Sequence, residues 1–283
     1  MLGSPRLYRH FVPAALAMNP VVERLAALGW LLPDWPAPAG VFAVCSTRAG
    51  GVSAAPWNSM NLGDHVGDAP AAVAANRARL RQAVGADPVF MRQPHGTDCV
   101  DLDSLAPGAV PSADACTSTT PGRACTVMVA DCLPVLLCDR EGRAVAAAHA
   151  GWRGLAAGVL EGCVRSLRGR LGRPDAELMA WLGPCIGPTA FEVGDEVRQA
   201  FVAGDADAAG CFRPGAAPGK WFADLAALAR RRLLAAGVGA VHGNDGGGAW
   251  CTVGDASRFF SHRRDAAVLG TTGRLAASIW RRV

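Results

Sequence analysis

The stretch that decides the fold covers residues 125–154 and reads CTVMVADCLPVLLCDREGRAVAAAHAGWRG. It contains apolar runs at residues 125–130, 134–139 and 144–148, and each run has the length of a buried strand. Glu141-Gly142 lies between the second and third runs and is a turn signal, which predicts a hairpin. The stretch therefore predicts neighbouring strands of one or more sheets, with polar residues where the strands end.

The segments on either side alternate between strand and helix patterns. Strands are predicted at residues 41–46 and 178–186, and helices at residues 71–84, 155–168, 195–202 and 225–236. The chain shows no internal repeat and no clean linker, and the glycine-rich residues 243–248 are typical of a loop. Helices mixed with hairpin-connected strands favour the α+β class.

The composition excludes several classes of protein. With 283 residues, of which 51% are hydrophobic and 18% charged, the chain is expected to be globular. The formal charge of +4 comes from arginines scattered along the chain, since Lys220 is the only lysine, so nucleic acid is not an expected partner. No apolar run reaches the length of a membrane span, and no membrane partner is expected either.

The cysteines and the first residues bear on location. The ten cysteines include no Cys-x-x-Cys pair, and most lie in apolar runs, which favours free thiols in a reducing compartment. Residues 1–17 resemble a secretory signal, but Pro13 interrupts their short apolar stretch. We therefore expect a cytoplasmic protein, with Met18 as an alternative start to Met1.

Three residues are candidates for one shared site. His95 stands in QPHG, Cys132 in ADCLP and His149 in AHAGWRG, each at the end of an apolar strand pattern. Strand ends hold side chains rigidly at clefts, and adjacent glycines allow a ligand or a second backbone to approach closely. Two imidazoles and a thiolate suit zinc and leave a fourth position open for water or substrate. We expect these three side chains to converge within metal-ligand distance.

The same residues also have simpler interpretations. The separations between them are long, unlike the short paired spacings of zinc fingers, so spacing alone does not single out a metal site. A histidine at a strand end commonly makes only hydrogen bonds, and a buried cysteine such as Cys132 is commonly inert. On the residues alone, both interpretations stay open.

Several blocks of the sequence resemble the YfiH-type, laccase-domain family. The segments with the candidate ligands, residues 93–96, 130–137 and 147–158, look like that family's ligand-bearing motifs and occur in the family's order. Further matching blocks are residues 46–53, 61–63, 76–77, 182–184, 186–188, 191–194, 221–225, 259–265 and 272–274. The resemblance implies a catalytic domain at residues 41–283, preceded by a partly flexible extension and lead-in at residues 1–40.

The resemblance also implies a fold, a metal and a reaction. The family fold is a single-domain, four-layer α/β/β/α sandwich, and the family's metal ligands match His95, Cys132 and His149. Members cleave adenosine, inosine and methylthioadenosine with phosphate to a free base and a ribose 1-phosphate, and they also deaminate adenosine. The implied cofactor is zinc, with copper as the alternative. Phe191 and His262 stand where tyrosine is usual, and Pro94 where an aliphatic residue is common, which leaves the preferred nucleoside open.

Charged residues near the motifs are candidates for substrate binding. Phosphorolysis needs a phosphate held beside the sugar, so arginine donors are expected close to the metal. The candidates are Arg48, Arg153 and Arg264, and we expect Arg48 or Arg153 to face the cleft, whereas Arg264 fits a surface salt bridge equally well. Deamination needs an activated water, which an open zinc position supplies. Asp131 is expected to orient a ligand or move a proton, unless it only caps a turn. The candidate catalytic residues are Cys132, His149, Asp131 and Arg153.

Other functions fit part of the pattern. A four-copper oxidase is disfavoured because six histidines with no His-x-His pair cannot ligate its cluster, although a single-copper polyphenol oxidase stays open. A cysteine hydrolase with Cys132 as nucleophile and His149 as base is the main alternative. It would suit peptidoglycan editing, a role described for some family members, and a non-catalytic metal-binding protein is a third alternative. The expected partners are purine nucleosides and phosphate, and the chain is expected to be a monomer or a homodimer.

Overall fold

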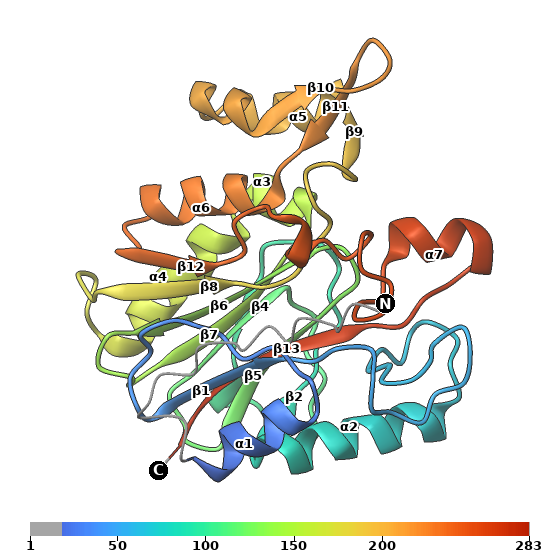
Figure 1. Cartoon of the computed structure of the whole chain (residues 1–283). Coiled ribbons are helices and arrows are strands. Elements are labelled where there is room, and N and C mark those ends of the chain that lie inside the picture. The colour runs from blue at the N-terminus through green and yellow to red at the C-terminus, as the bar shows by residue number, and fades with distance from the viewer. Residues whose placement is uncertain (1–18, 283) are drawn as a thin grey trace, which may run out of the picture.

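The computed structural model describes residues 19–282 (Figure 1). The signal-like residues 1–17 and the alternative start at Met18 lie outside the described residues. Within residues 19–282, no helix is both long enough and apolar enough to cross a membrane.

The predicted hairpin forms the centre of a six-stranded mixed sheet. Its strands β6 (Leu133–Asp139) and β7 (Val145–Ala150) are antiparallel and place Pro134 opposite His149. The strand order is β12 (Ala240–Gly243), β8 (Leu178–Leu182), β6, β7, β4 (Ala115–Ser118) and β3 (Cys99–Asp101). All residues of β6 and β7 are buried, which explains why these strands appear in the sequence as continuous apolar runs.

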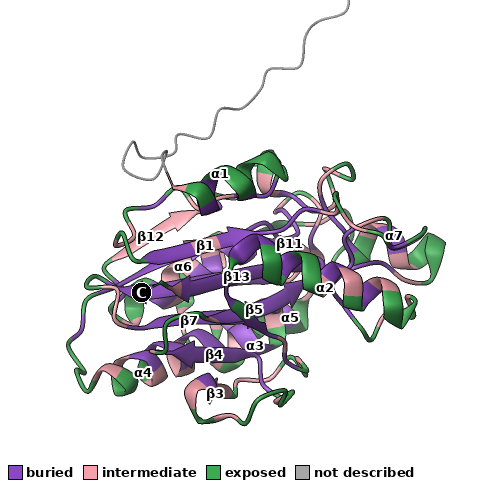
Figure 2. Cartoon of the chain, turned by 90° about the horizontal axis from the view of Figure 1, so that it is seen from below, coloured by how far each residue is buried: buried purple, intermediate pink, exposed green. Residues whose placement is uncertain are grey.

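A four-stranded sheet packs against the first one. Its order is β1 (Val41–Cys45), β13 (Leu275–Arg281), β5 (Arg123–Val129) and β2 (Asp87–Val89). Val127, Leu136 and Ile279 belong to the core cluster shared by the two sheets, and Figure 2 shows the central strands buried along their length. Because β5 belongs to one sheet and β6 to the other, the chain crosses between the sheets at residues 130–132.

Helices pack against each sheet on the side away from the other sheet (Figure 1). The helices on the six-stranded sheet are α4 (Val159–Leu171) and α6 (Leu225–Ala235), and those on the four-stranded sheet are α1 (Pro20–Ala27) and α2 (Pro70–Val84). Leu25 of α1 and Leu80 of α2 share a core cluster with Trp280 of β13. Part of the lead-in at residues 1–40 is therefore packed onto the domain.

The remaining elements connect the strands and helices of the two sheets. They are α3 (Trp152–Ala157), α5 (Asp195–Val202) and α7 (His262–Leu269), the small sheet of β10 (Phe212–Pro214), β11 (Lys220–Ala223) and β9 (Glu192–Gly194), and the 3₁₀ turns η1 (Leu102–Ser104), η2 (Ala206–Cys211) and η3 (Gly248–Trp250).

The α+β class predicted from the sequence is confirmed, and two predicted elements need correction. The helix predicted at residues 155–168 is two helices, α3 and α4, because Gly158 joins them with a φ of 103° that breaks the helical path. The strand predicted at residues 178–186 ends at Leu182. Gly183-Pro184 follows it, and proline has no N–H with which to continue the ladder.

Candidate metal centre

Three side chains meet at one end of the hairpin. Cys132 lies where the chain crosses between the sheets, His149 is near the end of β7, and His95 lies on the loop between β2 and β3. Their ligand atoms all lie within 4.8 Å of one another, and Cys132 Sγ is 3.8 Å from His95 Nε2. Ligand atoms around one tetrahedral zinc ion lie about 3.3 to 3.8 Å apart, given the usual bond lengths. The donor types and their spacing therefore fit a single ion after a small contraction.

The backbone at this site adopts an uncommon conformation. Among residues 19–282, His95 and Asp131 are the non-glycine residues with positive φ, at 65° and 88°. Such residues persist where the surrounding structure imposes the conformation. At His95 the cause is Asp114, whose carboxylate accepts hydrogen bonds from His95 N at 3.0 Å and from Gly96 N at 2.6 Å. These bonds fix the loop that carries the His95 imidazole.

Asp114 also orients the second imidazole. His149 Nδ1 lies 2.8 Å from Asp114 Oδ1, and both side chains are almost fully buried. With Nδ1 donating to the carboxylate, Nε2 is left for a ligand, which is the common arrangement of metal-binding histidines. The sequence did not identify Asp114, because 19 and 35 residues separate it from His95 and His149. Asp114 also stands directly before β4, whose residues ACTS are half polar and give no pattern of a buried strand.

Two glycines in the motif around His149 make room for the site. A Cβ on Gly151 would lie 3.0 Å from both Cys132 Sγ and His95 Cδ2. A Cβ on Gly154 would lie 2.6 Å from the backbone oxygen of Gly96. The absence of side chains at these positions thus allows α3 to approach the ligand loop closely.

The electrostatics of Cys132 and His149 are coupled. Burial by itself raises the pKa of the Cys132 thiol, but the His149 and His95 imidazoles outweigh it and lower this pKa to about 6. Burial by itself lowers the pKa of His149, yet Cys132 and Asp114 together raise it to about 9. Because the thiolate is the form that binds metals and attacks electrophiles, Cys132 is prepared for either chemistry.

The three residues line a cleft of about 980 Å³, large enough for a small organic ligand. Its apolar lining includes Phe90, Met128, Trp152, Ile186 and Phe191, and the described arginines that reach it are Arg77, Arg92, Arg263 and Arg274. The positions that depart from the family pattern, Pro94, Phe191 and His262, line it as well. The cleft therefore combines flat apolar surface with cations around the candidate ligands.

Two of the arginines expected at the phosphate lie outside this cleft. The Arg48 guanidinium donates to the backbone oxygens of Asn58 and Ala256, both at 3.0 Å, and stacks over the Phe260 ring. Arg153 is exposed, and its guanidinium stacks over the indole of Trp152. Neither lines the cleft, so the expectation that one of them faces it is not met. For Arg48 the physical reason is that backbone carbonyls and an aromatic ring occupy its guanidinium.

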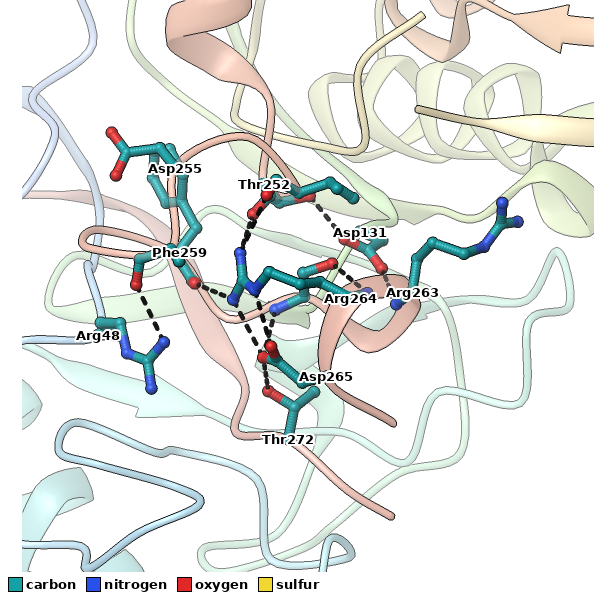
Figure 3. Close-up of polar contacts among 12 residues, drawn as sticks. Arg48, Asp131, Thr252, Asp255, Phe259, Arg263, Arg264, Asp265 and Thr272 are labelled. Atoms are coloured by element: carbon teal, nitrogen blue, oxygen red, sulfur yellow. Dashed lines mark hydrogen bonds and ion pairs between the residues drawn. The ribbon is translucent and has the colours of Figure 1, made fainter. Parts of the chain in front are cut away.

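Arg264, the third expected arginine, is also occupied within the protein. It donates to the Asp265 carboxylate at 2.7 Å and to the backbone oxygens of Thr252 and Phe259 at 2.6 and 2.9 Å (Figure 3). Its side chain does not line the cleft. These contacts give Arg264 a structural role, joining the start of α7 to the segment that precedes it.

Asp131 lines the cleft, and both of its carboxylate oxygens have donors. Thr252 Oγ1 donates to Oδ1 at 2.6 Å, and Arg263 N donates to Oδ2 at 2.6 Å (Figure 3). Asp131 therefore ties the Cys132 loop to the first turn of α7. Its expected role in orienting a ligand agrees with this arrangement better than a role in moving a proton.

The fold and the site define an α+β protein with a candidate two-histidine, one-cysteine metal centre in an arginine-lined cleft. The chain belongs to the family described as multi-copper polyphenol oxidoreductase laccase, whose model matches residues 42–282. This is the YfiH-type, laccase-domain family that the sequence blocks resemble, so that prediction is confirmed.

Similar proteins cover almost the whole domain. A Pseudomonas aeruginosa protein named purine nucleoside phosphorylase is 55% identical over 251 residues, which is 89% of this chain and 98% of the relative. The Escherichia coli purine nucleoside phosphorylase YfiH is 50% identical, over 88% of this chain and 98% of the relative. The crystal structure of a Neisseria meningitidis protein matches with a TM-score of 0.82 and 49% identity, covering 90% of this chain and 99% of that one. YlmD from Geobacillus stearothermophilus matches with a TM-score of 0.81 and 33% identity, covering 90% and 96%.

Proposed function

We propose that this chain is a metal-dependent purine nucleoside phosphorylase that cleaves adenosine, inosine and methylthioadenosine to the free base and the corresponding ribose 1-phosphate. The observation that carries the proposal is the meeting of His95, Cys132 and His149 in an arginine-lined cleft. The names of relatives at 55% and 50% identity support the reaction. Deamination of adenosine is a second proposed activity of the same site, and the proposed framework is the family's four-layer α/β/β/α sandwich.

In the proposed reaction, a phosphate oxygen bonds to the anomeric carbon while the bond from that carbon to the purine nitrogen breaks. The electron pair of the broken bond stays with the purine, which takes up a proton. Positive charge builds on the sugar ring during the exchange, so the phosphate has to be held against that face of the sugar. Apolar and aromatic side chains of the cleft would hold the purine, and arginines would hold the phosphate.

His95, Cys132 and His149 would hold the metal, which we propose to be zinc, with copper as the alternative. Zinc in such a three-ligand site supplies a Lewis acid with an open coordination position. The residues around it have positioning roles. Asp114 fixes both imidazoles, and Asp131 holds the Cys132 loop against α7.

Substitutions at Cys132 test this proposal. Cys132→Ala removes a ligand, and we expect it to lose most of the bound metal and most of the base release, since two imidazoles alone hold zinc poorly. Cys132→Asp is expected to retain part of both, because a carboxylate coordinates zinc. The measurements are metal content by mass spectrometry and base release from each nucleoside with and without phosphate.

Cys211→Ala provides a matched control, since Cys211 is partly exposed and does not line the cleft. We expect it to keep metal and activity. A Cys132→Ala protein with full phosphate-dependent base release would rule out the metal-centred mechanism.

A cysteine hydrolase acting on peptidoglycan is the second candidate, and one observation favours it. Cys132, His149 and Asp114 form a chain of nucleophile, base and orienting carboxylate, with the pKa of the thiol lowered to about 6. Alkylation of the purified protein separates the two functions. A metal-bound Cys132 is expected to react with iodoacetamide only after chelation, whereas a free nucleophile would react at once.

Among residues 19–282, the His, Cys, Asp and Glu side chains form one cluster suited to a metal ion, so a multicopper centre lacks ligands there. We propose a cytoplasmic protein, which the ten unpaired cysteines support. We further propose a monomer or homodimer that acts on nucleosides and phosphate rather than on nucleic acid.

A further inference from the structure

A second group of polar side chains lies in the cleft beside the candidate metal centre. Arg77 on α2, Arg274 just before β13, and Asp64 and His65 on the loop between β1 and α2 all line it. Arg77 and Arg274 belong to the family-like blocks at residues 76–77 and 272–274, and the resemblance implies no role for either of them. All four residues come from the part of the fold built on the four-stranded sheet, whereas Cys132 and His149 lie at the six-stranded sheet.

Arg274 has no carboxylate within ion-pair distance among the described residues. Its guanidinium donates only through Nη1, to the backbone oxygens of Thr272 at 3.1 Å and Gly273 at 3.2 Å. Nε and Nη2 therefore have no acceptor from residues 19–282. Burial lowers the pKa of Arg274, so the side chain is partly withdrawn from water. Cys132 and Asp131 by themselves raise this pKa, but neither of them is ion-paired with or hydrogen-bonded to Arg274. A cleft-lining guanidinium with free donors and no ion-paired carboxylate attracts an anion.

Arg77 is held in a fixed direction beside it. Its side chain is 23% exposed, its Nε donates to Leu62 O at 3.0 Å, and its guanidinium stacks over the Phe90 ring at 4.1 Å. Asp64, the acid of this group, pairs with Arg77 at 3.2 Å but is 57% exposed. Arg77 is thus ion-paired with one exposed carboxylate and Arg274 with none, so the two guanidinium groups together carry one more charge than the acid that pairs with them.

A buried asparagine pair sets the positions of both arginines. Asn61 Oδ1 accepts from Arg274 N at 2.8 Å and from Gly63 N at 2.9 Å. Asn76, which precedes Arg77 on α2, donates to Asn61 O at 2.9 Å. A Cβ on Gly63 would lie 2.7 Å from Arg274 Cγ, so the glycine leaves space for the arginine stem. The two guanidinium groups are therefore placed by one internal network, unlike mobile surface arginines.

We propose that Arg77 and Arg274 form the subsite that binds inorganic phosphate in the cleft. The proposal rests on the proposed function, because it assigns the co-substrate of that reaction. Planar guanidinium groups bind phosphate oxygens through paired, charge-assisted hydrogen bonds. The purine then lies toward Trp152 and Phe191, which line the cleft from the side of the six-stranded sheet and its helices.

The kinetic test compares Arg77→Gln and Arg274→Gln with Arg79→Gln, a matched control on the same helix that is exposed and outside the cleft. At saturating inosine, we expect the KM for inorganic phosphate to rise at least about tenfold in each cleft variant, since a charge-assisted hydrogen bond is lost. The KM for inosine at saturating phosphate is expected to change less than about twofold. Arg274→Lys is expected to recover part of the phosphate affinity, because an ammonium still binds phosphate as a point charge.

A second readout does not depend on turnover. Inorganic phosphate is expected to raise the Tm of the unaltered protein and of Arg79→Gln, but not that of Arg77→Gln or Arg274→Gln. Equal stabilisation of all four proteins, or of none, overturns the subsite. If the unaltered protein releases no base from any nucleoside, the proposed function fails, while the Tm comparison still decides whether the anion subsite exists.

A phosphate group can also arrive as part of a nucleotide, so inosine 5′-monophosphate forms the last arm of the test. Under the proposal, it competes with inorganic phosphate in the unaltered protein and shows no stabilisation beyond that of phosphate and inosine together. If the nucleotide raises the Tm through Arg77 and Arg274 and inorganic phosphate does not, the occupant is a phosphate ester. That result overturns the assignment to the co-substrate.

Discussion

Asp114 is the residue on which both candidate imidazole ligands depend. It accepts hydrogen bonds from His95 N, Gly96 N and His149 Nδ1. In Asp114→Asn, one of the two acceptor oxygens becomes an NH2 group, which would then face one of these three N–H donors. We expect its affinity for zinc to fall about 10- to 100-fold, as for other changes to the partners of metal-binding histidines. Competition with a chromogenic chelator measures this affinity.

Asp98→Asn is a suitable control for that measurement, because Asp98 is exposed and close to His95 in sequence. We expect it to bind zinc as the unaltered protein does. An Asp114→Asn protein that is folded, by circular dichroism, and retains unchanged zinc affinity would show that the carboxylate does not position the imidazoles.

The placement of single residues shows where sequence reasoning succeeds and where it stops. Cys132 and His149 stand out because each lies at the end of a buried strand, and strand ends are rigid points that the backbone pattern itself reveals. His95 is instead on the loop between β2 and β3, where the Asp114 carboxylate holds the backbone in place. The direction of a long, flexible side chain has no such signal. Arg48 turns to backbone carbonyls and the Phe260 ring, whereas Arg274 reaches the cleft, and this difference depends on contacts between segments far apart in the sequence.

At the scale of elements, the approach of α3 to the His95 loop is the contact on which the site depends. A Cβ on Gly154 would lie 2.6 Å from Gly96 O, and Asp114 holds the N–H groups of that loop in place. Gly154→Ala should therefore push α3 and the loop apart. We expect the free energy of unfolding to fall by about 1 to 3 kcal/mol, as for overpacking in a core, together with a loss of bound metal. Urea denaturation and metal analysis provide the two readouts.

Gly169→Ala tests the same substitution where α4 has open space, since no atom lies within 4 Å of the added Cβ. Alanine is the better helix former, so we expect this variant to gain up to about 1 kcal/mol of stability and to keep its metal. If Gly154→Ala behaves like Gly169→Ala, close packing of α3 on the loop is not required for the site.

The elements themselves could be predicted where burial is complete. The strands of the hairpin and β5 are continuous apolar runs, and their pattern identifies them without knowledge of the fold. The division of residues 155–168 into α3 and α4 was missed because Gly158 is tolerated within a helical pattern, and its φ of 103° depends on how α3 packs.

At the scale of the whole molecule, the site exists because two sheets meet. The chain leaves the four-stranded sheet after β5 and enters the six-stranded sheet at β6, and Cys132 lies at this crossing. The cleft consequently receives the candidate metal ligands from one side and Arg77 and Arg274 from the other. Which strands share a sheet is a property of long-range pairing, so the sequence pattern of residues 125–154 predicts the strands but not the crossing.

The edge of the six-stranded sheet gives the molecule a pH-dependent stability. Burial by itself raises the pKa of Asp103, but hydrogen bonds from Ser118 and Thr119 outweigh it and hold this pKa well below its ordinary value of 3.8. A carboxyl group whose pKa is lower in the folded than in the unfolded protein stabilises the fold above its unfolded pKa, and this contribution is lost as the pH falls below it. Asp103→Asn should therefore lower the free energy of unfolding at pH 7, on the order of 2 kcal/mol, and less at pH 3. Urea denaturation at pH 7, 5 and 3 measures the difference in free energy of unfolding between the variant and the unaltered protein. Asp175→Asn, whose side chain is 78% exposed, is the control. If Asp103→Asn lowers the free energy of unfolding by the same amount at pH 7 and at pH 3, ionisation of Asp103 does not stabilise the sheet edge.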